Sequence, residues 1–358
     1  MIQRLSAIEL KDFHRATGEW LSGRGPQNGI VISTRIRLAR NLSGFPFPPK
    51  MDDAQRKEVV EMAALALRGH AVRLDMEESQ PIDRSFLVER HLISKELANG
   101  DGARAVLFGR GERISIMVNE EDHLRIQCIT SGFDLDRTWR ALARIDRALS
   151  QQLPFAFNQR LGFLTSCPTN VGTGMRVSLM MHLPALTMKE HITKVLRAAE
   201  NMAMALRGLY GEGTQAFGDF YQVSNQATLG RSEEEIIENI KKLIPVILKY
   251  EQSMRDAMLD KERVAIEDRV QRSLATLRAA KAMNVEEMMQ HMSMVRMGLT
   301  MGLLTEKDIT LAQLNELFLL CQPAHLQKHE HRSLTPEERD TLRADIIRRK
   351  LAGGESLN

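Results

Sequence analysis

The stretch IVISTRIRLA, residues 30–39, decides the fold class of this sequence. Its apolar and polar side chains alternate, as in a β-strand that buries one face and exposes the other. Because side chains repeat with a period of two along a strand, Arg35 and Arg37 share the polar face, and two neighbouring cations require an anion between them. The expected apolar side holds Ile30, Ile32, Ile36 and Leu38, and the expected polar side holds Ser33, Arg35 and Arg37.

Similar alternation returns further along the chain, between stretches whose apolar residues recur every three or four positions, as in amphipathic helices. Two of the expected strands flank the short turn at 119–122, which favours an antiparallel hairpin, and no GxGxxG fingerprint supports a Rossmann fold. The first part of the chain is therefore predicted to be α+β, an antiparallel sheet flanked by helices. Further strands are expected at 114–118, 123–129, 161–167 and 175–182, and helices at 53–69, 84–98, 136–152 and 187–207.

The pattern changes after Ser232, which forms a capping box with Glu235 and begins a region with few strand signals. Further helix starts are expected at Asn284 and at Thr335, and the glycine pair at 353–354 is expected to stop the last helix. Core or helix–helix packing explains the methionines of 283–301 better than an adaptable binding groove does. We expect a catalytic domain over residues 1–250 and a helical C-terminal domain over 251–358.

Composition excludes several classes of protein. Apolar residues make up 43% and charged residues 27%, which is typical of a folded globular chain, and the formal net charge of +3 is too small for general attraction to nucleic acid. Three scattered cysteines fit neither a disulfide framework nor a zinc site, so no metal-ligating residues are predicted. The sequence contains no apolar run long enough for a signal peptide or a membrane span, and we expect a cytoplasmic protein.

Arginine recurs on the polar faces of other expected strands. Arg125 shares a strand face with His123 and Gln127, and Arg176 shares another with Ser178, Met180 and His182, while Arg207 is expected to end a helix before Gly208. Each arginine alone is most simply a solvated surface charge. Several of them on one sheet suit a polyphosphate, because the planar guanidinium pairs two oxygens and keeps its charge.

Two turns lie beside these strands. The loop 167–176 carries two glycines and small hydroxyl residues, which let backbone donors approach an oxyanion, although an ordinary β-connection uses similar residues. Glu120, Glu121 and Asp122 crowd three carboxylates into one turn. Such a turn is either a solvated acidic loop or a site for magnesium or a guanidinium, because like charges repel without a cation nearby.

Four runs in order resemble the ATP:guanidino phosphotransferases, the family of the phosphagen kinases and the bacterial protein arginine kinases. They are STRIRLARN from Ser33, VNEEDHLRIQ from Val118, GFLTSCPTNVGTGMR from Gly162 and RGLYGEG from Arg207. The resemblance covers roughly residues 30–250. It implies a guanidino kinase or glutamine synthetase-like catalytic domain that uses ATP and Mg²⁺.

The resemblance also implies roles for individual residues. Glu121 and Glu212 would face the substrate guanidinium, which is charged and a poor nucleophile, so that carboxylates must orient it and accept its proton. Cys167 would lie near the substrate nitrogen, although a small buried residue at a strand end is an equal alternative. Tyr210 stands where phosphagen kinases have a second arginine. The nucleotide would be bound by Ser33, Thr34, Arg35, Ile36, Arg37, His91, Arg125, Arg176, Val177, Ser178, Leu179, Met180, Arg207, Gly208, Leu209, Tyr210, Gly211 and Glu212.

Two features favour the protein arginine kinases within this family. Only a short segment precedes Ser33, where phosphagen kinases carry a helical domain, and a long segment follows the catalytic motifs. The run RDTLRA, residues 339–344, resembles the phosphoarginine-binding motif of the protein arginine kinases, although alone it is an ordinary charged helix. This resemblance assigns allosteric phosphoarginine binding to Arg339, Asp340, Arg343 and Ala344.

The resemblance implies protein substrates phosphorylated on arginine, a stress-response setting, an activator protein and a Clp-type ATPase and protease as partners. It also implies a homodimer or a larger assembly, with no nucleic acid or membrane. Two alternatives stay open. One is a kinase for a small guanidino compound such as free arginine, and the other is a non-catalytic adaptor that binds phosphoarginine.

Overall fold

A nine-stranded sheet forms the centre of the computed structural model, which describes residues 3–5, 13, 17–69, 71–208, 216–305 and 307–352. The strand order is β1-β3-β4-β5-β6-β2-β9-β11-β10, and neighbours run antiparallel except for the edge pair β1 and β3. A separate short hairpin is formed by β7 (Phe157–Asn158) and β8 (Gly162–Phe163). The strands of the large sheet are β1 (Gln3–Leu5), β2 (Val31–Arg40), β3 (Val72–Asp75), β4 (Ala105–Phe108), β5 (Ile114–Val118), β6 (Leu124–Ser131), β9 (Met175–His182), β10 (Met204–Gly208) and β11 (Phe220–Asn225).

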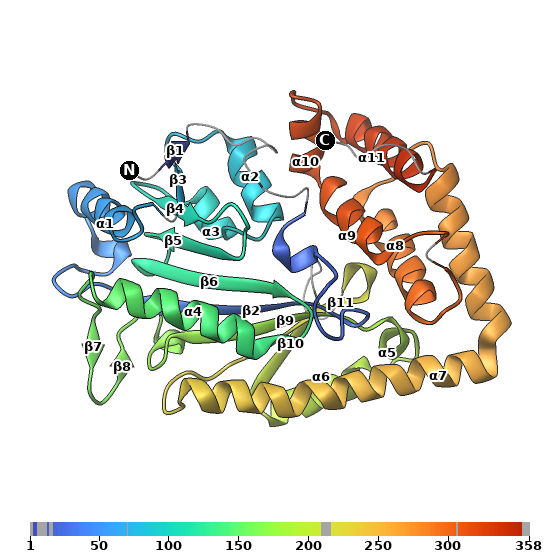
Figure 1. Cartoon of the computed structure of the whole chain (residues 1–358), viewed down its shortest axis with the longest axis horizontal. Helices are drawn as coiled ribbons and strands as arrows, with labels where there is room; N and C mark the ends of the chain where they lie inside the picture. The colour runs from blue at the N-terminus through green and yellow to red at the C-terminus, as the bar shows by residue number, and fades with distance from the viewer. Residues whose placement is uncertain are drawn as a thin grey trace.

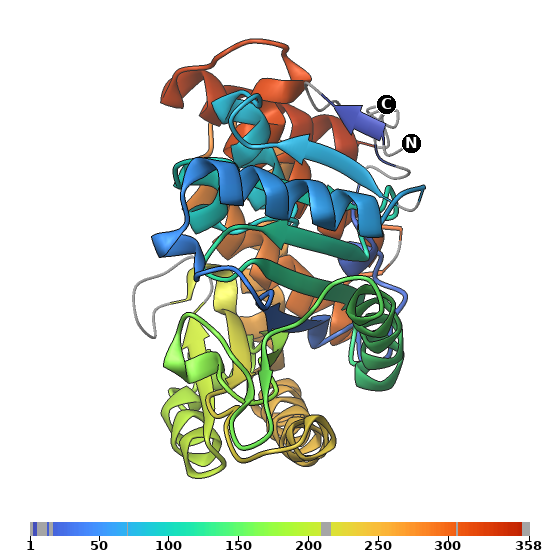
Figure 2. The ribbon, with the colours of Figure 1, turned by 90° about the vertical axis from the view of Figure 1, so that its left-hand side faces the viewer.

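Helices pack against both faces of this sheet (Figures 1 and 2). In the catalytic part they are α1 (Asp53–Ala66), α2 (Pro81–Glu89), α3 (Lys95–Asn99), α4 (Leu135–Ser150), α5 (Pro184–Met188) and α6 (Ile192–Asn201). The C-terminal part contains α7 (Glu233–Ala279), α8 (Val285–Thr300), α9 (Leu311–Leu320), α10 (Pro323–His329) and α11 (Pro336–Leu351). The α+β class and the antiparallel sheet expected from the sequence are confirmed.

The back face of the sheet packs against α1, α4, α6 and the first half of α7. Ile36 and Leu38 of β2 contribute to this core together with Leu142 of α4 and Ile240 of α7. Figure 1 shows α7 running along the sheet and then turning toward the C-terminal helices. The turn lies at Glu262, whose φ of −135° and ψ of 22° are not helical.

The front face of the sheet meets the C-terminal helices at one end of its strands. Ile32, Ile129 and Phe220 from the sheet share a hydrophobic cluster with residues of α8, α9 and α11. Met288, Met289, Met292 and Met297 are all buried in this cluster. The methionine-rich stretch is therefore core, and burial of its side chains joins the helical region to the sheet.

Ile32 was expected beside Ile36 on the back of the sheet, and this expectation is wrong. The register between β2 and β9 shifts between Val31 and Ser33, which is a β-bulge. One extra residue in a strand turns the side chains on its two sides toward opposite faces. Ile32 consequently packs on the front, against the cluster that holds Trp20 and Met180.

Several expected boundaries also differ. The strand expected at 161–167 is only the short β8, and the helix expected at 84–98 is divided into α2 and α3. The helix expected at 187–207 ends at Asn201, so Arg207 lies in β10 rather than at a helix end. Tertiary pairing with β11 decides this last case, because strand formation there depends on a partner distant in the sequence.

The helix starts read from the sequence agree with the structure. Ser232 and Thr335 each form a complete capping box, and Asn284 accepts a hydrogen bond from the backbone of Glu287. Such caps satisfy backbone donors that the first helical turn leaves unpaired. The last helix ends at Leu351, and the glycines at 353–354 lie outside the described residues.

A polar junction joins α2 to α10. The carboxylate of Glu89 accepts hydrogen bonds from the backbone nitrogens of Ala324 (2.7 Å) and His325 (3.0 Å) and lies 2.7 Å from Nδ1 of His325. Burial raises the pKa of Glu89 to about 7, although these backbone donors and the charges of Arg343 and Arg339 act in the opposite direction. The folded protein therefore holds a proton on Glu89 at pH values where the unfolded chain has released it.

This shift predicts a pH-dependent stability. Between the ordinary carboxyl pKa and about 7, the folded state binds more protons than the unfolded state, so the free energy of unfolding falls as pH rises. For Glu89 this loss amounts to up to about 3 kcal/mol. Urea unfolding at pH 5 and pH 8 measures the fall in the free energy of unfolding. We expect this fall to be smaller in Glu89→Gln than in the wild type by about that amount. Equal pH slopes in both proteins would contradict the assignment.

Candidate functional site

The basic side chains predicted from alternation meet on the front face of the sheet. Arg37 of β2 lies directly opposite Arg176 of β9, and Arg35 lies opposite Ser178 of the same strand. Arg125 reaches this face from β6, where its partner in the register is Ala39 of β2. Three adjacent strands therefore place four guanidinium groups on one surface, as the spacing of the arginines predicted.

A hollow of about 220 Å³ lies where these arginines meet the acidic turn. It brings together candidates for both halves of the predicted chemistry, from segments far apart in the sequence. Gly174 lets the loop pass close to β2, because its φ is +63° and an added Cβ would lie 2.6 Å from the carbonyl oxygen of Ala39. The lining residues are Arg37, Ala39, Glu120, Glu121, Asp122, Arg125, Cys167, Thr169, Asn170, Gly174 and Arg176.

Positive charge accumulates in this hollow without full compensation. The pKa of Arg37 is lowered well below its ordinary value, first by burial and then by the charges of Arg35, Arg125 and Arg176. Burial and the charges of Arg207 and Arg125 lower the pKa of Arg176 as well. Among the described residues, the buried Nε atoms of Arg37 and Arg176 have no hydrogen-bond acceptor. An anion bound here would relieve both the repulsion and the missing hydrogen bonds.

Glu120 is the carboxylate of the acidic turn that pairs with an arginine of the sheet. Both oxygens of Glu120 accept from Nη1 of Arg125, at 2.6 and 2.8 Å, and Glu120 also accepts from Ser94 at 2.5 Å. Glu120 raises the pKa of Arg125 although burial opposes this effect. Glu120 therefore fixes the guanidinium of Arg125 at the hollow.

Glu121 is the exposed carboxylate of this turn. Its carboxylate accepts a long hydrogen bond of 3.4 Å from the amide nitrogen of Asn170. Burial of part of the carboxylate raises its pKa, as do the charges of Asp122 and Glu120, whereas Arg125 and a hydrogen bond from Cys167 lower it. A carboxylate with a raised pKa that borders the hollow is suited to accept a proton.

Cys167 is half-buried and its Sγ lies 3.0 Å from the hydroxyl of Thr169. Because its thiol also hydrogen-bonds Glu121, its removal takes a stabilising contact from the ionised carboxylate. We expect Cys167→Ala to move the acidic limb of the pH–rate profile to higher pH, with turnover at alkaline pH lowered less than about tenfold. An unchanged acidic limb, or complete loss of turnover at every pH, would contradict this role.

The other residues predicted to bind the nucleotide continue from this hollow across the sheet. Arg35 donates to Ser178 (3.3 Å) and to Oε1 of Gln222 of β11 (2.9 Å). Arg207 of β10 lies opposite Gln222, and its side chain is exposed. Nε2 of His91 is buried and has no partner among the described residues. Burial and the charges of Arg35 and Arg37 lower the pKa of His91 to about 3, so its imidazole is neutral.

Not every predicted nucleotide-binding side chain reaches this face. Alternation sends Thr34 to the back of the sheet, where its hydroxyl donates to the carbonyl of Gly132 at 2.6 Å. Ser33 and Met180 lie on the front but are buried, Met180 in the cluster beneath the C-terminal helices. Gly208 ends β10, and the predicted Leu209, Tyr210, Gly211 and Glu212 lie outside the described residues. The back-face core contains Ile36, Val177 and Leu179.

The RDTLRA run lies on α11, which packs against α7 and α10. Arg343 is buried and donates to the carbonyls of Cys321 (2.9 Å) and Met283 (2.7 Å) and to Asp340 (2.5 Å). Asp340 and Arg343, three residues apart on α11, form an ion pair. Ala344 is buried in the helical core, whereas Arg339 is half-buried, with a contact of 3.4 Å to the carbonyl of Leu334. Arg343 therefore joins α11 to the chain at Cys321 and at Met283.

Sequence reasoning missed part of the site. Glu120 and Asn170 were visible only as members of an acidic turn and a glycine-rich loop, without separate roles. Ser94 and Gln222, which fix Glu120 and Arg35, carried no local signal because their partners are distant in the sequence. Such contacts depend on strand order, which alternation alone does not provide.

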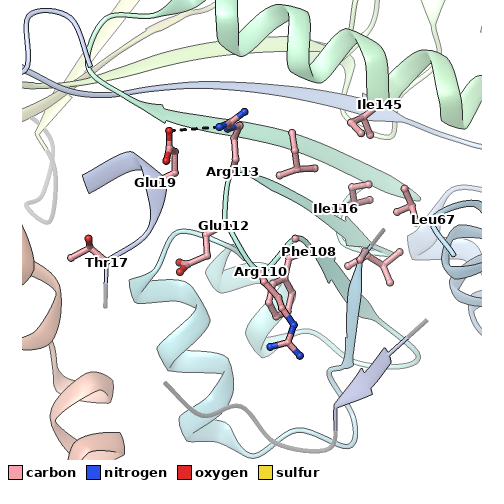
Figure 3. A pocket seen from close by; sticks show the side chains of 14 residues that line it. Thr17, Glu19, Leu67, Phe108, Arg110, Glu112, Arg113, Ile116 and Ile145 are labelled. Carbon is pink, nitrogen blue, oxygen red and sulfur yellow. Dashed lines mark ion pairs between the residues drawn. The ribbon is translucent and has the colours of Figure 1, made fainter. Parts of the chain in front are cut away.

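A second hollow, of about 430 Å³, lies at a different place beside β4 and β5 (Figure 3). Its wall is largely apolar, with Leu67, Ile116 and Ile145, and its rim carries Arg113, which pairs with Glu19 at 3.8 Å. None of the residues predicted to bind nucleotide or substrate lines it. The candidate active site is therefore the smaller, charged hollow.

Comparison with known proteins identifies the family. Residues 52–254 match the family model described as ATP:guanido phosphotransferase, C-terminal catalytic domain, and residues 263–358 match the Protein-arginine kinase McsB C-terminal domain. The protein-arginine kinase of Symbiobacterium thermophilum is 43% identical over 94% of this chain and 98% of its own length. The protein-arginine kinase of Caldanaerobacter subterraneus subsp. tengcongensis is 46% identical over 90% of this chain and 97% of its own length.

Solved structures agree in fold. A lombricine kinase superposes with a TM-score of 0.59 at 24% identity, covering 67% of this chain and 72% of that chain. The duplicated taurocyamine kinase from Schistosoma mansoni, with bound transition state analog components, superposes with a TM-score of 0.58 at 25% identity. The match covers 75% of this chain and 40% of that chain. The chain belongs to the ATP:guanido phosphotransferases, and within them to the protein-arginine kinase family.

Proposed function

We propose that this chain transfers the γ-phosphoryl group of ATP to the guanidinium of arginine side chains in proteins. The proposal is carried by the charged hollow, which Arg37, Arg125 and Arg176 line together with Glu121 and Cys167. Phosphoryl transfer needs in-line placement and cations where negative charge develops, and both sides of the reaction have side chains here.

The arginines are proposed to hold the nucleotide phosphates. Within the described part of the chain, the buried Nε atoms of Arg37 and Arg176 lack acceptors. Bound phosphate oxygens would supply those acceptors. The nucleotide is proposed to lie between His91 and Arg207, with the 208–212 segment as part of the site. Mg²⁺ usually binds through phosphates and one or two carboxylates, so we propose that it arrives with the nucleotide, near Glu120 and Glu121.

The acidic side is proposed to prepare the acceptor. Glu121 orients the substrate guanidinium and takes one N–H proton as that nitrogen attacks phosphorus. A bond between nitrogen and phosphorus forms, the bond from phosphorus to the bridging oxygen of ADP breaks, and the electron pair leaves with ADP. Glu212 is proposed as a second carboxylate against the guanidinium.

The acceptor is proposed to be a protein. The relatives above are named protein-arginine kinases, and residues 263–358 match a domain described for those enzymes. We also propose that the chain divides functionally into catalytic residues 1–250 and helical residues 251–358. The helices α8, α9 and α11, which share one buried cluster, support a separate helical part of the chain.

Mass spectrometry that preserves the acid-labile P–N bond tests the proposal directly. After incubation with Mg²⁺-ATP and an unfolded protein, phosphate is expected on arginine in the wild type and absent in Glu121→Gln. A parallel reaction with free arginine separates the two kinase classes. Phosphorylation of free arginine alone would favour a small-molecule kinase, and no transfer to either acceptor would favour an adaptor.

Residues of α11 are proposed to bind phosphoarginine away from the active site. Arg339 is half-buried beside Asp340, so a phosphoryl group and a guanidinium could meet opposite charges there. Calorimetric titration of the full chain with a phosphoarginine peptide tests this site, and binding that is unaffected in Arg339→Ala would refute it.

The family resemblance further supports a proposed setting in a bacterial stress response. An activator protein, a Clp-type protease that receives the marked proteins, a homodimer or larger assembly, and a cytoplasmic location belong to this proposal. None of the described helices carries an apolar stretch long enough to cross a membrane. Light scattering of the purified chain would test the assembly, and co-purification with a Clp-type ATPase would test the partnership.

A further inference from the structure

His91 is held in an unusual conformation beside the candidate nucleotide site. Its φ of 58° lies in the left-handed region, which a residue with a side chain adopts at a cost when the surroundings enforce it. Its carbonyl oxygen accepts a hydrogen bond of 2.6 Å from Gln127, which is the partner of Arg37 in the sheet register. The position of the imidazole therefore depends on what fixes the residues around it.

The two preceding residues are fixed by the C-terminal helices. Glu89 accepts from the first backbone nitrogens of α10, as described above, and lies 2.7 Å from Nδ1 of His325. Arg90 is fully buried, pairs with both oxygens of Glu112 at 2.8 and 2.5 Å, and places Nη1 3.3 Å from Nε2 of His325. The C-terminal domain thus contacts the chain immediately before His91.

The tautomer of His325 follows from these contacts. A guanidinium can only donate, so Nε2 of His325 accepts from Arg90 and Nδ1 carries the proton that is donated to Glu89. The ring packs against Phe86 of α2 at a tilt of 35°, with centroids 4.2 Å apart. One imidazole therefore links both residues before His91 to α10.

The C-terminal domain also reaches His91 from its other side. Trp20 meets the imidazole edge-on at a centroid distance of 4.6 Å, and its indole contacts Phe318 of α9 at 6.2 Å. Trp20 is fully buried, so it has no freedom to move away from either ring. Two independent contacts, through α9 and through α10, therefore converge on one residue of the nucleotide site.

We propose that Glu89, Arg90 and His325 are positioning residues for His91, through which the C-terminal helical domain sets the affinity of the catalytic domain for ATP. The inference rests on the proposed role of His91 at the nucleotide. The imidazole of His91 is held beside Arg35 and Arg37 before ATP binds. ATP binding therefore does not have to supply the conformational entropy that ordering this side chain would cost. Loosening the junction should therefore weaken ATP binding while leaving the chemical step largely intact.

The test compares single variants of the full-length chain in the arginine phosphorylation assay. His325→Ala is expected to raise the KM for ATP about tenfold and to change kcat at saturating ATP less than about twofold. His325→Asn restores a donor near the position of Nδ1 and should recover much of the lost affinity. Asp83→Asn removes the buried ion pair with Lys328 at the same interface of α2 and α10. It should lower the stability of the interface but leave the KM for ATP within about twofold of the wild type.

A spectroscopic readout separates positioning from general loosening. The chain has two tryptophans, so a Trp139→Phe background leaves Trp20 as the single reporter of the His91 contact. His325→Ala is expected to shift the emission of Trp20, and Asp83→Asn is expected to leave it unchanged. An equal rise of the KM for ATP in His325→Ala and Asp83→Asn would overturn the inference, because interface strength alone would then explain it.

His91→Ala distinguishes the possible failures. If His91→Ala raises the KM for ATP and His325→Ala does not, the junction fails as a positioning device and the proposed nucleotide site stands. If His91→Ala leaves the KM unchanged, the role of His91 at the nucleotide is wrong, and the inference falls with it. Absence of arginine phosphorylation by the wild type would instead refute the proposed function.

Discussion

Glu121→Gln is expected to lower the turnover number for arginine phosphorylation by about 10²–10⁴-fold, the usual contribution of a positioned general base. The substitution keeps the size of the side chain and an oxygen for the contact with Asn170, and it removes both the negative charge that orients the guanidinium and the capacity to accept its proton. Glu121 is exposed and holds no buried ion pair, so the thermal midpoint should change little. Single-turnover kinetics with a protein acceptor at saturating ATP measures the effect on the chemical step.

Glu120→Gln is the matched control, because it makes the same change one residue earlier. Glu120 holds Arg125 through both carboxylate oxygens, so its loss should weaken the binding of phosphates and raise the KM for ATP more than it lowers kcat. The two variants should therefore separate into a defect of chemistry and a defect of nucleotide binding. A Glu121→Gln enzyme that keeps nearly all of its turnover would exclude Glu121 as the base.

Much of this site could be predicted because it depends on local patterns. Alternation in β2, β6 and β9 placed Arg37, Arg125 and Arg176 on polar faces, and antiparallel pairing of these strands brought the faces together. A period of two is a property of the strand itself and needs no knowledge of its neighbours. The capping boxes at Ser232 and Thr335 were equally local.

The missed features depend on distant partners. All four residues of β4 are buried, so this strand shows no alternation, and β10 carries a sequence that suits a helix until β11 pairs with it. The bulge that turns Ile32 to the front likewise exists only in the register with β9. The junction of Glu89 with His325 joins residues 236 positions apart, which no local pattern indicates.

Arg37→Met is expected to lower kcat/KM for ATP by about 10³-fold, as the loss of one cation at a developing phosphoryl charge usually does. The same substitution should leave the protein at least as stable as the wild type. Arg37 carries a buried Nε without an acceptor, and its pKa is lowered by burial and by three neighbouring arginines. A folded chain keeps such an unfavourable charge where activity requires it. Thermal unfolding and steady-state kinetics of the same preparation test both halves of this prediction.

Arg40→Met, three residues along the same strand, should behave in the opposite way. Arg40 is buried, pairs twice with Asp146 at 3.0 Å, and donates to the carbonyls of Ala39 and Thr173. Its removal breaks a buried ion pair and is expected to cost about 3–5 kcal/mol of unfolding free energy. If Arg37→Met lost stability as Arg40→Met does, Arg37 would be a structural cation with satisfied partners. The hollow would then lack the uncompensated charge that an ATP phosphate is proposed to neutralise.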